Sequence, residues 1–64
     1  YPVGSNVKLN TGEVAVILQV NEKHIIRPDI LIIKDKFGKT IEPYKISLVN
    51  DKSRFIVGAA AIEE

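Results

Sequence analysis

The chain has 64 residues, with nine Lys and Arg against eight Asp and Glu, one His and no Cys. This length allows one domain, which buries only roughly 60% of the surface that its unfolded chain exposes. The composition excludes a disulfide framework and a zinc site of clustered His and Cys, and a net charge of +1 lacks the basic excess of a dedicated nucleic-acid binder.

The first half of the chain predicts two strands joined by a tight turn. Pro2 and Gly4 place a turn at the start, and residues 7–9 alternate between apolar and charged side chains, as in a half-buried strand. Gly12 suits a left-handed position in the turn that follows. Residues 13–20 are apolar on both faces, so we expect a long central strand that bends and serves two sheets of a small barrel.

The second half of the chain predicts a long loop and three further strands. We expect residues 21–28 to form the loop, because Pro28 cannot donate a hydrogen bond within a central ladder. Gly38 favours a tight turn, and Pro43 is expected to stop the strand before it. Residues 44–49 either continue that strand past a bend or form one turn of 3₁₀ helix. The three strands are expected at residues 29–34, 40–42 and 54–57.

Short strands at this spacing predict an all-β fold, in particular a small five-stranded SH3-like barrel. The alternative is an OB-fold, which usually has a longer chain and a helix between its third and fourth strands. We expect the barrel at residues 1–58 and a tail at residues 59–64. Because the chain opens with Tyr1 rather than Met, we expect a domain of a longer protein. The lack of cysteines, of a signal peptide and of a long apolar run predicts a cytoplasmic location without a membrane span.

The residues that could carry catalysis or bind a metal are scattered along the chain. His24 stands alone between Lys23 and Ile25, and we expect it to be solvated in the loop. No serine has an evident base beside it, and the glycines do not form a phosphate-binding loop. We therefore predict no catalytic residue, no metal ligand and no cofactor, and no enzymatic activity of the isolated chain.

Two groups of residues are candidates for binding another molecule. Ile25 and Ile26 lie in the predicted loop just before Arg27 and Pro28, where an apolar pair is hard to explain by the core alone. The pair either caps an open end of the barrel or docks against a neighbouring domain. The other group is a set of lysines near one hairpin, which either contact phosphates or form a solvated rim; they are Lys34, Lys36 and Lys39. Phosphate contacts would make the chain an RNA-binding SH3-like (KOW-type) small barrel, which is our alternative hypothesis.

Short motifs in a fixed order give the chain a resemblance to a known family. They are Tyr1-Pro2-Val3-Gly4-Ser5, Val7-Lys8-Leu9, Thr11-Gly12-Glu13-Val14-Ala15-Val16-Ile17, Val20-Asn21, Arg27-Pro28 and Asp35-Lys36-Phe37-Gly38. In this order they resemble the small β domain C-terminal to the catalytic domain in bacterial HD-GYP (HD domain) phosphohydrolase signalling proteins. The resemblance covers residues 1–57. The chain departs from the family pattern at residues 22–26, where the family usually has a loop rich in Asn and Pro.

The resemblance implies a parent protein in bacterial signalling whose catalytic domain is a metal-dependent phosphohydrolase, typically acting on cyclic di-GMP. The His-Asp pair and the Gly-Tyr-Pro triplet of that catalytic domain are absent from this chain, so no catalytic residue carries over. The chain would then be a non-catalytic accessory module that packs on the adjoining catalytic domain or on another protein. Arg27, which matches the family motif, would either bond loop carbonyls or form a salt bridge to the adjoining domain.

Overall fold

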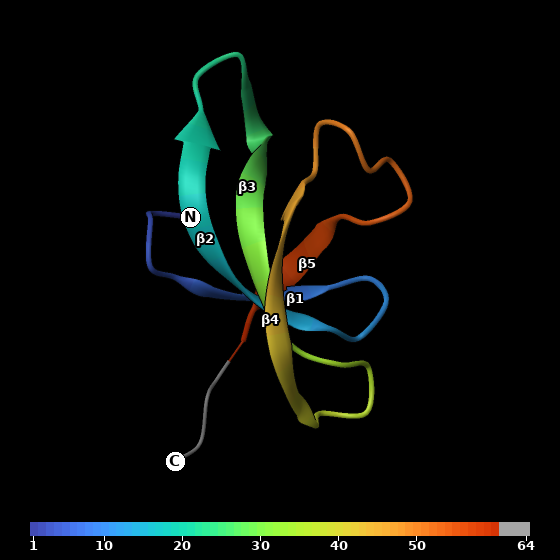
Figure 1. Cartoon of the computed structure of the whole chain (residues 1–64). Coiled ribbons are helices and arrows are strands. Elements are labelled where there is room, and N and C mark those ends of the chain that lie inside the picture. The colour runs from blue at the N-terminus through green and yellow to red at the C-terminus, as the bar shows by residue number, and fades with distance from the viewer. Residues whose placement is uncertain (61–64) are drawn as a thin grey trace.

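The computed structural model describes residues 1–60, which form a single antiparallel sheet of five strands and no helix (Figure 1). The strands are β1 (Asn6–Leu9), β2 (Val14–Asn21), β3 (His24–Lys34), β4 (Thr40–Ser47) and β5 (Ile56–Ala59). Their order in the sheet is β4-β3-β2-β1-β5, so the last strand returns to pair with the first. The sheet curls into a small barrel-like form, which confirms the prediction of an all-β, five-stranded SH3-like fold.

The core lies on one face of the curled sheet and consists of small and branched aliphatic side chains. Its buried members are Val7, Leu9, Ala15, Ile17, Ile30, Ile32 and Leu48. In β1, β2 and β3 they occupy alternate positions, as side chains on one face of a strand must. The opposite face of β2 is covered only in part, because Val14 and Val16 are half-buried while Leu18 and Val20 are exposed. All five strands belong to one sheet, so β2 does not serve two sheets as expected.

The loop predicted at residues 21–28 is wrong, because this segment forms a strand hairpin. β2 ends at Asn21 and β3 begins at His24, so only Glu22 and Lys23 make the turn. The Asn21 side chain accepts a hydrogen bond from the backbone N–H of Lys23 at 3.0 Å, a local bond that favours a tight turn. The candidate residues 25–28 therefore lie within β3.

Pro28 fits into β3 because the pairing with β2 is interrupted around it. Gln19 pairs with Asp29 and Asn21 pairs with His24, so Val20 alone stands opposite the four residues 25–28. An ordinary β-bulge sets two residues against one, so this irregularity is a larger one. Pro28 has no N–H to offer to a ladder, and its carbonyl accepts the N–H of Leu48 at 3.3 Å. The expectation that Pro28 cannot donate within the ladder was correct. The chain accommodates it with a bulge inside the strand instead of a loop.

Pro43 does not stop β4, which continues to Ser47. The register of β3 and β4 shifts between the pairs Ile32–Tyr44 and Lys34–Thr40, so Pro43 lies in an irregular part of an edge strand. An edge strand tolerates a residue that cannot donate. Residues 44–47 therefore follow the first of the two alternatives, a strand that continues, and a turn at 48–50 comes after them.

The last strand begins two residues later than expected. Phe55 bonds to Asn10 outside the ladder: its N–H donates to Asn10 Oδ1 at 2.8 Å, and its carbonyl accepts the N–H of Asn10 at 2.9 Å. β5 ends at Ala59. The boundary between barrel and tail stays a prediction, and residues 61–64 of the expected tail lie outside the described residues.

The two turns at the same end of the sheet have the backbone geometry predicted for them. Gly12 and Gly38 have φ of 94° and 80°, in the left-handed region that favours glycine. A Cβ at Gly12 would lie 3.4 Å from the carbonyl oxygen of Lys36, so the β1–β2 turn packs closely on the β3–β4 turn. The two turns are therefore in contact at this end of the sheet.

Candidate interaction surfaces

The interrupted pairing of β2 and β3 leaves two isoleucines in solvent. Ile25 and Ile26 are 71% and 81% exposed, so they do not cap the barrel within the described residues. Together with Tyr1, Pro28 and Ile56 they line a hollow of about 240 Å³, which we call the apolar groove. Among the residues that the structure describes, no charged side chain lines this groove. The structure thus brings three of the four sequence candidates together, and adds Tyr1 and Ile56, which the sequence analysis did not select.

The N-terminal segment is held in place beside the apolar groove. The N–H of Gly4 donates to the carbonyl of Ile17 at 2.8 Å, and the N–H of Ile17 donates to the carbonyl of Ser5 at 2.9 Å. The N–H of Ser5 closes a turn on the carbonyl of Pro2 at 3.1 Å. These bonds to β2 fix the direction in which Tyr1 leaves the sheet.

Arg27 follows the two isoleucines in β3, and its side chain bonds to another part of the chain. Its Nη1 donates to the carbonyl of Leu48 at 3.1 Å and to the carbonyl of Arg54 at 3.2 Å. The side chain is half-buried, and it ties the irregular part of β3 to the segment that leads from β4 to β5. Of the two roles considered for Arg27, the structure shows the bonding of carbonyls.

A buried carboxylate joins segments that the backbone ladder leaves apart. Glu13, only 9% exposed, accepts hydrogen bonds from Thr11 Oγ1 at 2.6 Å, from Arg54 Nε at 2.8 Å and from the hydroxyl of Tyr44 at 3.0 Å. Arg54 also forms an ion pair with Asp51. We call these five residues the closing network. Within residues 1–60 no ladder joins β4 to β5, so the network holds the β4 edge close to the segment that precedes β5.

The closing network shifts the protonation equilibria of its members. Burial raises the pKa of Glu13, but the hydrogen bonds from Thr11, Arg54 and Tyr44 together outweigh burial and hold this pKa below its ordinary value. Burial, followed by the bond to Glu13, raises the pKa of Tyr44. The bond from the Ser53 hydroxyl and then the bond from Arg54 lower the pKa of Asp51. The network therefore favours charged carboxylates at Glu13 and Asp51 and a protonated hydroxyl at Tyr44, and its role is structural.

Sequence reasoning missed the closing network although one signal was present. Glu13 is a carboxylate at the start of the most apolar strand of the chain, and a charge in that place calls for a partner. The partners Tyr44 and Arg54 are separated from it by 31 and 41 positions. Only the fold brings them together.

The three candidate lysines lie on one hairpin at the other end of β3 from the groove. Lys34 is half-buried at the end of β3, and Lys36 and Lys39 are exposed in the turn. Phe37, between them, is 77% exposed, and Lys36 Nζ lies 5.2 Å from the centre of its ring. Asp35 is occupied by its own turn, because its Oδ1 accepts the N–H groups of Phe37 and Lys39, each at 2.9 Å.

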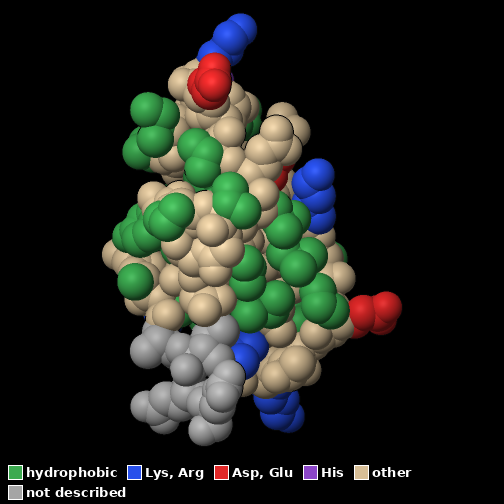
Figure 2. All heavy atoms as spheres, turned by 90° about the vertical axis from the view of Figure 1, so that its left-hand side faces the viewer, with side chains coloured by type: hydrophobic (Ala, Val, Ile, Leu, Met, Phe, Trp, Pro, Cys, Tyr) green, Lys and Arg blue, Asp and Glu red, His purple; other side chains and the backbone are tan. Residues whose placement is uncertain are grey.

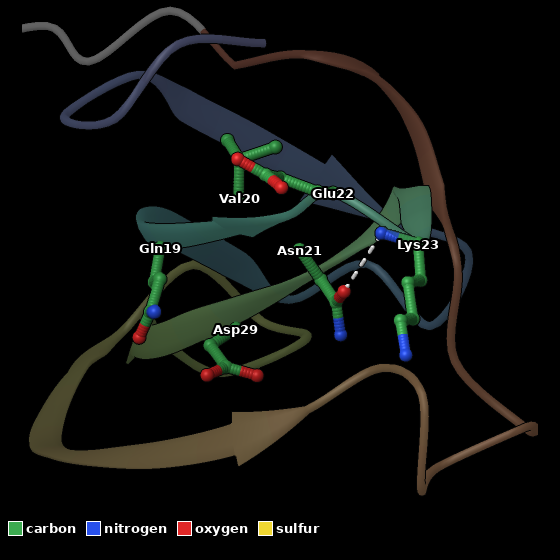
Figure 3. A pocket seen from close by; sticks show the side chains of 6 residues that line it. All are labelled: Gln19, Val20, Asn21, Glu22, Lys23 and Asp29. Carbon is green, nitrogen blue, oxygen red and sulfur yellow. Dashed lines mark hydrogen bonds between the residues drawn. The ribbon is translucent and has the colours of Figure 1, made fainter.

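A polar hollow lies beside the β2–β3 turn (Figure 3). Its polar side chains come from β2, the turn and β3, and only Asp29 is half-buried while the others are exposed. Within residues 1–60 no group of three His, Cys, Asp or Glu could hold a metal ion. His24 is exposed at the start of β3, instead of in a loop. The same residues contain no helix long and apolar enough to cross a membrane.

The fold and its surfaces define a small SH3-like β domain. The comparison with protein families identifies it further: residues 6–64 match the family described as "KOW domain associated with HD domain", and the chain belongs to this family. No curated protein and no solved structure matches the chain. The domain is therefore an accessory β module of HD-domain proteins, and the predicted association with an HD domain is confirmed.

Proposed function

We propose that this domain is a non-catalytic accessory module of a bacterial HD-GYP-type, metal-dependent phosphohydrolase in cyclic di-GMP signalling. One observation carries the proposal. The chain belongs to an HD-associated family, and it opens with the motif Tyr1-Pro2-Val3-Gly4. The ordered motifs along residues 1–57 support the narrower assignment to HD-GYP proteins. In this proposal the chemistry belongs to the HD domain, and the β module acts in the cytoplasm by packing against that domain.

The proposal is tested with the intact parent protein and with the 64-residue chain alone. We expect the intact protein to hydrolyse cyclic di-GMP when it is loaded with Mn²⁺ or Fe²⁺, and the chain alone to give no turnover above a blank. A version of the parent that lacks this module is the control for its contribution. Turnover by the isolated chain, or an intact protein that is inactive on cyclic di-GMP with either metal, would contradict the proposal.

RNA binding is the second candidate function, and one observation favours it. Lys34, Lys36 and Lys39 flank the exposed Phe37 along the chain, and Lys36 Nζ lies 5.2 Å from the centre of its ring. Nucleic-acid sites combine basic groups with a stacking surface. Single-stranded and duplex RNA are titrated while backbone amide shifts are followed. Binding that weakens with salt and shifts the amides of residues 34–39 would support this candidate. RNA binding is then compared between two pairs of variants. Lys36→Gln and Lys39→Gln alter the candidate site, and Lys8→Gln and Lys52→Gln, which remove exposed lysines elsewhere, are the matched controls.

A further inference from the structure

The apolar groove brings hydrophobic side chains together at the surface of the domain. Exposed isoleucines scattered singly need no explanation, but here two adjacent isoleucines share one hollow with Tyr1, Pro28 and Ile56. The face shown in Figure 2 carries hydrophobic side chains across its middle and most of its charged side chains near its outline. A hollow lined by apolar side chains, two of them largely exposed, is typical of a site that another protein covers.

Ile25 and Ile26 do not serve the core of the domain itself, although Ile56, which also lines the groove, packs against the core. The buried cluster is complete with side chains from β1, β2, β3 and Leu48, and Ile25 and Ile26 are not part of it. The shape of the groove depends on the bulge, since residues 25–28 stand opposite Val20 alone. Arg27 and the carbonyl of Pro28 fasten this bulge to the segment after β4. The domain thus holds an apolar surface in a defined shape while leaving it in solvent.

We propose that the apolar groove is the surface on which the HD domain of the same protein docks. The family places an HD domain together with this module, which supplies the partner. Tyr1 lines the groove, and its segment is pinned to β2, so a domain joined ahead of Tyr1 would meet the groove first. Among residues 1–60 no charged side chain lines the groove, so we expect the complementary surface to be apolar and the contact to be insensitive to salt. The inference rests on the proposed function only in taking an HD domain as the neighbour.

The test compares two exposed side chains at opposite ends of the domain within the intact parent protein. Ile26 is 81% exposed and Phe37 is 77% exposed, and the described part of the chain contains no cysteine. Ile26→Cys and Phe37→Cys are made separately, and the rate of thiol modification at each is read from the labelled peptide by mass spectrometry. Because both sites lie on the surface, neither substitution threatens the fold.

We expect Ile26→Cys to react about ten-fold or more slowly than Phe37→Cys in the intact protein, the change that about 1.4 kcal/mol of docking free energy produces. In the 64-residue chain alone the two rates should lie within about two-fold, because the side chains are similarly exposed. Adding Ile25→Ser to the Ile26→Cys protein should raise its rate towards that of Phe37→Cys, and the same effect should be absent when Leu18→Ser, a change at another exposed site, is added instead.

Equal rates at the two sites in the intact protein would overturn the docking surface. A slow rate at Phe37→Cys with a fast one at Ile26→Cys would overturn it as well, because the partner would then cover the lysine hairpin. Labelling does not depend on catalysis, so the two proposals can fail separately. An intact protein with a protected Ile26→Cys and no activity on cyclic di-GMP removes the proposed function alone, and an active protein with equal labelling rates removes the docking surface alone.

Discussion

The two ends of β3 differ in how completely the chain satisfies its own groups. At the end that leads into β4, two glycine turns pack together and Glu13 accepts hydrogen bonds from Thr11, Tyr44 and Arg54. At the end that follows β2, the pairing is interrupted and two isoleucines remain in solvent. The polar groups therefore find hydrogen-bond partners within the chain at the end where the barrel closes. At the other end, where we propose that a neighbour docks, apolar side chains remain exposed.

The largest effect outside the core is expected from Glu13→Ala, which removes the centre of the closing network. The substitution deletes three hydrogen bonds, and it leaves Tyr44 and Arg54 without the acceptor that they share. We expect a loss of about 2–3 kcal/mol in the free energy of unfolding, a typical cost for groups that lose a charged partner. Urea unfolding of the 64-residue chain measures it. A loss below that of an exposed control, Glu42→Ala, would show that the network does not close the barrel.

The contact between the two turns is tested by a pair of glycine substitutions. Gly12→Ala and Gly38→Ala both force alanine into a left-handed conformation, which costs about 1–2 kcal/mol each. A Cβ at position 12 would make an ordinary van der Waals contact with the carbonyl oxygen of Lys36 at 3.4 Å, whereas a Cβ at position 38 meets nothing within 4 Å. The two variants should therefore lose similar stability in thermal unfolding, because neither adds a clash to the backbone strain. A much larger loss for Gly12→Ala would mean that the turns lie closer together than described.

The closing network also predicts how stability depends on pH. The pKa of Glu13 is lowered in the folded state from a reference value of 4.5, so the stabilisation is fully present above that value. It is lost as the pH falls through the lowered pKa, because the unfolded chain then binds more protons. Asp51, whose pKa is also lowered, contributes with the same sign. Urea midpoints between pH 7 and pH 2.5 should fall less steeply for Glu13→Gln than for the unaltered chain. If the urea midpoints of the two proteins fell in parallel with pH, Glu13 would not be a source of the acid sensitivity.

The sequence predicted the fold class because its signals are local. The alternation of Val7 and Leu9, the apolar run of β2 and the glycines at 12 and 38 each determine their own segment, and the structure agrees with them. The loop at 21–28 was predicted wrongly because Pro28 was treated as a local breaker. Its missing N–H is accommodated by the bulge opposite Val20, which depends on the partner strand.

The sequence predicted only those residues of the candidate site that are neighbours along the chain. Ile25, Ile26 and Pro28 were selected because two isoleucines next to a proline are unusual in a loop, and they do share one surface. Tyr1 and Ile56 join them only through the pairing of β5 with β1 and the pinning of residues 4 and 5 to β2. Contacts between residues so far apart leave no pattern in a single sequence.

The smallest effect on stability is expected at the apolar groove, in the double variant Ile25→Ser and Ile26→Ser. Because these side chains are 71% and 81% exposed and lie outside the buried cluster, the isolated chain should lose no more than about 0.5 kcal/mol in the free energy of unfolding. The matched contrast is Ile32→Ala, a core change on the same strand that should cost about 2–5 kcal/mol. Urea unfolding compares the two variants under one set of conditions. A large loss for the double serine variant would mean that the isoleucines stabilise the domain itself, and the contrast between the two ends of β3 would then disappear.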